Sequence, residues 1–212
     1  MIIDTLFGDP MIFVAWLIAI LFAFTIHEFA HAYFAFRQGD PTPRLMGRIS
    51  FNPLRHIDTF GFISLLIVGF GWGKPVPINP IYFKDKKRGE MIVSLAGPLT
   101  NLFVAILFGV ILKIIWASGS FSMDNLMIIF LYNIVVINIV LCVFNLIPIP
   151  PLDGSHVLFA ILPDSLNDFK YQLSKHGPTV LMIIIFADIL LNLRIFEWLF
   201  SFFLGLANNL IF

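Results

Sequence analysis

Residues 11–36 read MIFVAWLIAILFAFTIHEFAHAYFAF, and this stretch decides the fold. No residue from Met11 to Ile26 is charged, and the run from Ala32 to Phe36 is again uncharged. The stretch therefore predicts one apolar helix of 26 residues. At about 1.5 Å per residue such a helix crosses a hydrocarbon core of ~30 Å with some tilt.

Inside this helix lies the motif His27-Glu28-Phe29-Ala30-His31, which has the pattern H-E-x-x-H. Two histidines four residues apart on a helix share one face and can bind one metal ion, and the Glu28 carboxylate borders that face. This is the arrangement of zinc proteases, in which the glutamate is the general base. A charge at the centre of a membrane helix costs about 2.5–3.5 kcal/mol on insertion scales, so the cluster favours a function over histidines that merely bond to neighbouring helices.

The composition places the whole chain in the membrane class. Of 212 residues, 59% are hydrophobic and 12% are charged, and the mean hydropathy is +0.94. A soluble domain usually has about a quarter of its residues charged. The formal net charge is zero, so no attraction to nucleic acid is expected. The single cysteine, Cys142, excludes an intramolecular disulfide.

The remaining apolar runs predict an all-α membrane protein, a polytopic bundle of about five transmembrane helices. After the first helix, further ones are expected at about 91–116, 126–146, 180–193 and 195–212, with a polar loop over 163–178. We treat residues 1–212 as a single integral-membrane domain, with a catalytic core at about 11–165 and two further helices within about 178–212.

Residues 37–90 form the longest polar stretch and hold nine of the thirteen basic residues. By the positive-inside rule this stretch faces the cytoplasm. Within it, Phe60 to Trp72 is apolar but too short to span. Its glycines and the prolines that follow predict extended or hairpin structure that re-enters the membrane. The segment Phe60 to Pro80 is the candidate for binding substrate as an added strand.

A zinc ion needs a third protein ligand, and several side chains are available. Asp153 is the best choice, because it follows three prolines at the end of the third helix, where irregular backbone can direct a carboxylate inward. His156, three residues later, is its rival. The other candidates are in polar loops or in the last two helices: His56, His176, Asp188 and Glu197.

Four motifs in this order resemble the site-2 protease family of intramembrane zinc metalloproteases. The resemblance covers roughly residues 20 to 165. It rests on H-E-x-x-H at 27–31, G-W-G-K-P-V-P at 71–77, A-G-P-L-T-N at 96–101 and N-L-I-P-I-P-P-L-D-G at 145–154. The chain is similar to a minimal form of the family, without PDZ or CBS domains.

The resemblance implies roles for five residues. It matches His27, His31 and Asp153 to the ligands of one Zn²⁺ per chain, and Glu28 to the general base. It matches Asn145 to an asparagine that holds the substrate or the oxyanion.

We therefore expect a zinc metalloendopeptidase that hydrolyses peptide bonds within or near transmembrane segments of other membrane proteins, as in regulated intramembrane proteolysis. Its partners would be such a substrate and the lipid bilayer, and not nucleic acid. We expect a multi-pass protein of a prokaryotic cell membrane, with the active site open to the cytoplasm. The alternatives are a membrane zinc transporter or sensor, and an inactive family member that acts as a binding scaffold.

Overall fold

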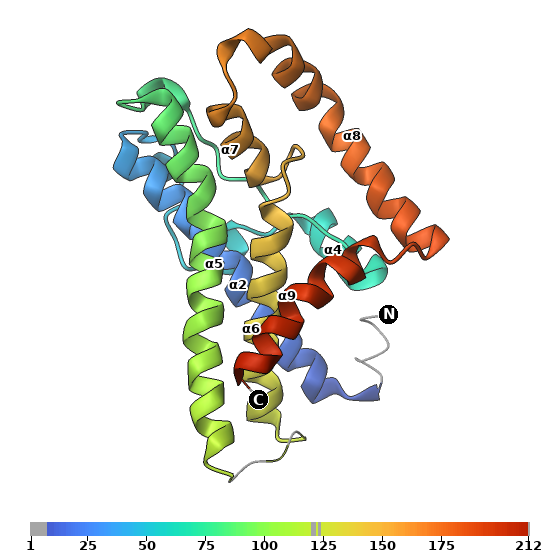
Figure 1. Cartoon of the computed structure of the whole chain (residues 1–212). Coiled ribbons are helices and arrows are strands. Elements are labelled where there is room, and N and C mark those ends of the chain that lie inside the picture. Colours follow the sequence, from blue (N-terminus) through green and yellow to red (C-terminus); the bar gives the residue numbers. More distant parts are fainter. Residues whose placement is uncertain (1–7, 120–121, 123, 212) are drawn as a thin grey trace.

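The computed structural model describes residues 8–119, 122 and 124–211, and these fold into helices joined by short connections (Figure 1). The long helices are α2 (Pro10–Gln38), α5 (Lys86–Ala117), α6 (Leu126–Asn145), α8 (Asn167–Leu191) and α9 (Ile195–Ile211). The short ones are α3 (Thr42–Leu45), η1 (Pro53–Arg55), α4 (Thr59–Val68), η2 (Pro80–Tyr82), α7 (Asp153–Ile161) and η3 (Asp164–Leu166). The described residues form no strand, and one antiparallel bridge joins Ile57 to Gly73.

Four helical stretches are long and apolar enough to cross a membrane: Pro10–Gln38, Lys86–Ala117, Leu126–Asn145 and Asp164–Leu191. This confirms the predicted all-α polytopic architecture. The number of spans differs from the expected five, because α9 has only 17 residues. At about 1.5 Å per residue it is shorter than a ~30 Å hydrocarbon core.

The ends of α2 follow from residues outside the apolar run. The Asp9 side chain accepts hydrogen bonds from the backbone N–H groups of Met11 and Ile12, which caps the amino end. Gly39 ends the helix at φ 111°, a left-handed conformation that suits glycine. The motif therefore lies well inside a helix that is defined at both ends.

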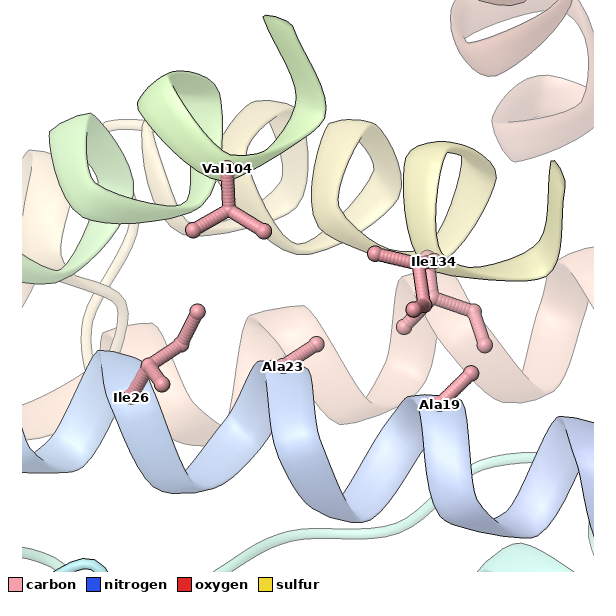
Figure 2. Packing of buried hydrophobic residues seen from close by; sticks show 6 residues of the cluster. Ala19, Ala23, Ile26, Val104 and Ile134 are labelled. Carbon is pink, nitrogen blue, oxygen red and sulfur yellow. The ribbon is translucent and has the colours of Figure 1, made fainter. Parts of the chain in front are cut away.

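Helices α2, α5 and α6 pack against one another and form the core. Figure 2 shows Ala19, Ala23 and Ile26 of α2 pointing toward Val104 of α5 and Ile134 of α6. In lipid, burying an apolar side chain gains little, since lipid tails are equally apolar. Small residues stabilise such a bundle instead, because they let two helix backbones come close together.

The segment that begins at Phe60 is helical, so the expectation of extended or hairpin structure there was wrong. Asp58 caps α4 by accepting a hydrogen bond from the N–H of Gly61, and Gly69 ends it at φ 81°. The glycines stand in its first turn and beyond its end, so they do not interrupt the helix. The ten-residue helix is too short to span, as predicted.

After α4 the chain runs back as residues 70–79, which we call the return segment. It packs very closely on its neighbours through two glycines. A Cβ on Gly61 would lie 2.0 Å from the carbonyl oxygen of Trp72, and a Cβ on Gly73 would lie 1.7 Å from the Phe24 ring of α2. The return segment therefore crosses α2 one turn before the H-E-x-x-H motif.

The stretch expected as a polar loop, 163–178, is largely helical as well. Helix α8 begins at Asn167 and continues through Pro178. Polar side chains on its first turns do not oppose a helix, and hydropathy alone does not distinguish an exposed helix from a loop. In Figure 1, α8 leans away from the bundle at the side of α7.

Candidate metal centre

Helix α2 presents the two histidines of the motif on one face, one turn apart. Their imidazole Nε2 atoms lie 3.0 Å from each other. Both side chains are buried, with 4% of His27 and 5% of His31 exposed. The predicted pair is thus formed by the geometry of a single helix.

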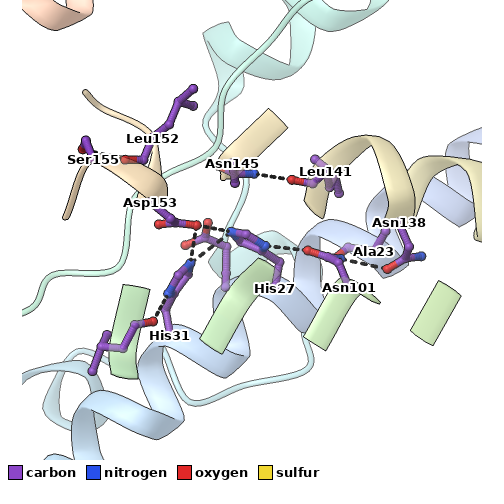
Figure 3. Close-up of polar contacts among 12 residues, drawn as sticks. Ala23, His27, His31, Asn101, Asn138, Leu141, Asn145, Leu152, Asp153 and Ser155 are labelled. Carbon is purple, nitrogen blue, oxygen red and sulfur yellow. Dashed lines mark hydrogen bonds and ion pairs between the residues drawn. The ribbon is translucent and has the colours of Figure 1, made fainter. Parts of the chain in front are cut away.

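The outer nitrogen of each ring is bonded to a neighbouring helix (Figure 3). The His31 Nδ1–H donates to the backbone carbonyl of Val93 at 2.8 Å. The His27 Nδ1–H donates to Oδ1 of Asn101 at 2.6 Å. Because Nδ1 carries the proton in both neutral rings, each Nε2 presents a lone pair to the other.

Asn101 is held in place by its own network. Its Nδ2 group donates to the backbone carbonyl of Ala23 at 3.0 Å and to Oδ1 of Asn138 at 2.8 Å. Asn138 in turn donates to the carbonyl of Ile134. Neither asparagine is exposed. The Asn101 amide therefore bonds to His27 and at the same time connects α5 to α2 and α6.

The third group is Asp153, the first residue of α7. Its Oδ2 lies 3.2 Å from Nε2 of His27 and 3.1 Å from Nε2 of His31. The turn between α6 and α7 brings it there, and that turn is tight: a Cβ on Gly154 would lie 2.3 Å from the carbonyl oxygen of Leu146. Asp153-Gly154 is therefore a pair in which the glycine permits the aspartate's approach.

These three side chains form the one group of metal-capable His, Cys, Asp or Glu residues found within the described part of the chain. Bonds of about 2.0–2.2 Å to a tetrahedral zinc ion place ligand atoms roughly 3.3–3.6 Å apart. The observed separations of 3.0–3.2 Å are a few tenths of an ångström shorter. Two lone pairs and a carboxylate oxygen at this distance repel unless they share a cation, so the donor set fits a metal ion.

Gly97 of α5 lies directly against this cluster. A Cβ there would be 2.4 Å from Nε2 of His31 and 2.7 Å from Nε2 of His27. From the sequence, Gly97-Pro98 is more readily explained as a packing device between helices. The structure shows that the glycine leaves room for the atoms that would bind a metal. Its position within the A-G-P-L-T-N motif is the sequence signal for this role.

Glu28 is nearly buried, with 9% exposed, and does not belong to the three-residue cluster. Oε2 of Glu28 lies 3.9 Å from Nη2 of Arg48, a buried residue that follows α3. A carboxylate next to the ligands but separate from them is what a general base requires.

His56 lies in the longest polar stretch of the sequence, which favours a solvated side chain, but the structure contradicts this. The side chain is fully buried. Its Nε2–H donates to the carbonyl of Ser50 at 2.8 Å, and its Nδ1 lies 3.4 Å from Nη2 of Arg48. Burial lowers the pKa of His56; the bond to Ser50 raises it in part, and the Arg48 charge lowers it further. The lowered pKa keeps the imidazole neutral near pH 7. By position, His56 does not belong to the three-residue cluster.

The remaining candidate ligands lie elsewhere. His156, the rival of Asp153, is exposed, and so is His176. Oδ1 of Asp188 accepts a hydrogen bond from the N–H of Ile195, and Glu197 forms an exposed ion pair with Arg194. Among the candidate third ligands, Asp153 is the one whose carboxylate lies beside the two histidines.

Asn145 is the last residue of α6 and is half-buried. Its Nδ2 group donates to the carbonyl of Leu141, one turn earlier in the same helix, at 3.0 Å (Figure 3). Only one of its two amide protons is needed for that bond, so the other stays available to a further acceptor.

Comparison with known proteins agrees with this geometry. The model of peptidase family M50 matches residues 15–190. Two similar proteins both bear the name "Putative zinc metalloprotease". YwhC of Bacillus subtilis is 36% identical over 174 residues, which cover 79% of this chain and 78% of that protein. Rip2 of Mycolicibacterium smegmatis is 29% identical over 203 residues, covering 91% and 73%. No solved structure matches the chain.

The family model includes α2, α5, α6 and α7, and so all residues of the candidate metal centre. Four apolar helices long enough to span agree with a membrane-bound peptidase. The chain belongs to peptidase family M50, the site-2 protease family of metalloproteases.

Proposed function

We propose that the protein is an intramembrane zinc metalloprotease that binds one Zn²⁺ through His27, His31 and Asp153. The observation that carries the proposal is the position of Glu28. It lies beside three metal-capable side chains, but outside their cluster, in a helix long enough to span a membrane. A peptidase needs this carboxylate free as a base, whereas a transport site would more often use it as a ligand.

When bound, zinc supplies Lewis acidity, which makes a water molecule acidic near neutral pH and polarises a peptide carbonyl. Glu28 takes the proton from that water as it attacks the carbonyl carbon. Glu28 then donates the proton to the leaving amine. Asn101 and the Val93 carbonyl keep the proton of each imidazole on Nδ1, so that both Nε2 atoms remain ligands.

Asn145 is proposed as the polar group that stabilises the oxyanion or holds the substrate backbone. It stands at the end of α6, immediately before the turn that carries Asp153. Its second amide proton gives the donor that this role requires. Loss of such a donor typically lowers turnover about 10²- to 10³-fold.

The proposed substrate is the transmembrane segment of another protein, cut in regulated intramembrane proteolysis. The carbonyls of a helix are already hydrogen-bonded, so the substrate must unwind locally. The return segment supports this step, because it is non-helical and lies against α2 next to the motif. Nine of thirteen basic residues lie in 37–90, which supports a cytoplasmic position for this stretch. Water would then enter the site from the cytoplasmic side. The bacterial relatives support a prokaryotic cell membrane.

The test is coexpression with a panel of single-span membrane proteins, with zinc measured in the purified chain. The wild type should cut at least one of them. Glu28→Gln should retain its zinc but lose cleavage, because the amide cannot accept the proton. Equal cleavage by Glu28→Gln would overturn the assigned base.

The same experiment examines the transporter or sensor alternative. If Glu28 were a ligand, Glu28→Gln would lower zinc content as strongly as His27→Ala does. A wild type that binds zinc but cuts nothing, together with zinc-dependent transport in vesicles, would favour that alternative.

A further inference from the structure

Arg48 is a buried charge outside the metal-binding cluster. Only 4% of it is exposed, although it lies in an irregular stretch between α3 and η1. Burying a guanidinium group is costly unless its charge and its N–H groups are compensated.

Two of those partners are carbonyls of the return segment. Nη1 of Arg48 donates to the carbonyl of Pro75 at 2.8 Å, and Nη2 donates to the carbonyl of Lys74 at 2.5 Å. Nε is buried without a hydrogen-bond partner among the described residues. The guanidinium therefore fixes the return segment, but carbonyls alone do not neutralise its charge.

Glu28 is the one carboxylate within 4.0 Å of Arg48 in the described part of the chain. At 3.9 Å, the Oε2–Nη2 distance is too long for a hydrogen bond. The attraction is then purely electrostatic, and both carboxylate oxygens of Glu28 remain open to accept a proton. A closer, bidentate pair would occupy the oxygens that the base needs.

His56 completes the surroundings of Arg48 without adding a charge. Its Nε2–H is bound to the Ser50 carbonyl, so Nδ1 turns a lone pair toward Nη2 of Arg48 at 3.4 Å. A neutral imidazole in this tautomer accepts from Nη2, the nitrogen that also donates to the Lys74 carbonyl. Glu28 is thus left as the counter-charge.

We propose that Arg48 is a positioning residue that orients the Glu28 carboxylate and ties it to the return segment at Lys74 and Pro75. This inference rests on the proposed function, in which Glu28 is the general base. Arg48 interacts with both the return segment and the Glu28 carboxylate, so a shift of the return segment would be transmitted to Glu28.

The first measurement is cleavage by Arg48→Gln and Arg48→Lys in the coexpression assay, followed by kinetics on the purified zinc-loaded protein. Arg48→Gln should lower kcat by roughly tenfold to a hundredfold, part of the 10²–10⁴ that general acid–base catalysis contributes. Its KM and zinc content should stay within about twofold of wild type, and Arg48→Lys should recover part of kcat. Arg55→Gln, at an exposed arginine that ends η1, is the matched control.

Chemical rescue separates charge from packing. Millimolar guanidinium should restore part of the kcat of Arg48→Gly, while urea, its neutral analogue of similar shape, should not. Equal rescue by urea, or a wild-type kcat for Arg48→Gln, would overturn the proposal.

A double-mutant cycle tests the pair without any cleavage. Melting temperatures of wild type, Glu28→Gln, Arg48→Gln and the double variant should be non-additive, with Arg48→Gln less harmful once Glu28 is neutral. Additive shifts would overturn the interaction between the two residues. Absence of cleavage by the wild type would instead overturn the proposed function, and the cycle would still decide whether the two groups interact.

Discussion

The two halves of the helical bundle share α5 and α6 but hold different interiors. Where the second half of α2 meets the first half of α5, the interior contains buried His27, His31, Asn101 and, from α6, Asn138. The other half, between α5, α6 and α9, is apolar throughout its cluster: Leu112, Ile128, Leu131, Val135 and Ile211.

The difference shows where polar groups are tolerated at membrane depth. Lipid-facing helices gain little by burying more apolar surface, so the apolar half needs only close packing. In the polar half, each donor must have its acceptor, and the imidazoles, amides and backbone carbonyls there are matched. In the polar half, the loss of one donor or acceptor atom leaves its partner without a hydrogen bond. Substitutions there should therefore affect the metal centre far more than substitutions in the apolar half.

Removal of a metal ligand should have the largest effect. His27→Ala or His31→Ala should abolish bound zinc, and Asp153→Ala should weaken it severely, because a site with three protein ligands then has two. Zinc per chain, measured by mass spectrometry of the metal, is the readout. Cys142→Ala, from the apolar interior of α6, should retain full zinc. If His156→Ala loses zinc while Asp153→Ala keeps it, the third ligand is wrongly assigned.

Two glycines of α5 make the sharpest matched pair. Gly97→Ala should displace the imidazoles and lose most of the zinc, since its Cβ would lie 2.4 Å from Nε2 of His31. Gly109→Ala, in the apolar half, would have the Ile211 side chain at 3.8 Å as its nearest neighbour among the described residues and should be harmless. Zinc content and melting temperature of both variants give the answer. Equal zinc in the two would contradict the close approach at Gly97.

Asn145→Leu should leave zinc content and folding near wild type but lower cleavage by about two orders of magnitude, as expected for an oxyanion donor. A mere bond between helices would be worth only about 0.6 kcal/mol. Asn133→Leu, nearer the amino end of α6, is the control and should lose far less. Wild-type cleavage by Asn145→Leu with lowered stability would show that the residue only packs.

Asn101→Leu should weaken zinc affinity about 10- to 100-fold, the usual effect of losing a group that orients a metal-binding histidine. Asn138→Leu should have a smaller effect in the same direction, because it acts through Asn101. Competition with a zinc-specific dye measures both affinities. Because Asn138 contacts Asn101, it is not a suitable control for Asn145. A larger loss of zinc affinity in Asn138→Leu than in Asn101→Leu would contradict the proposed order, in which Asn138 acts on His27 through Asn101.

In two segments, α4 and the first turns of α8, the sequence predicts irregular backbone where the structure has a helix. The prediction rests on glycine content for α4 and on polarity for α8, and neither property excludes a helix. Capping by Asp58 and the placement of glycines outside the helix interior allow α4 to form. The candidate substrate segment, Phe60 to Pro80, includes residues 60–68, which are helical. Its return segment, residues 70–79, has the non-helical backbone that strand pairing needs.

The sequence by itself determined the membrane class, the positions of α2, α5 and α6, and the pair His27 and His31, because helical periodicity and apolar length are local properties of the chain. The tertiary structure alone decided which residues meet across the helices. The sequence favours Asp153 over His156 as the third ligand, but the fold is what places its carboxylate against both histidines. The fold also places Asn101 and the Val93 carbonyl at the two Nδ1 atoms, Gly97 against the two Nε2 atoms, and buried Arg48 beside Glu28. These contacts join residues 20 to more than 120 positions apart, and their formation depends on how the helices pack, which no local pattern encodes.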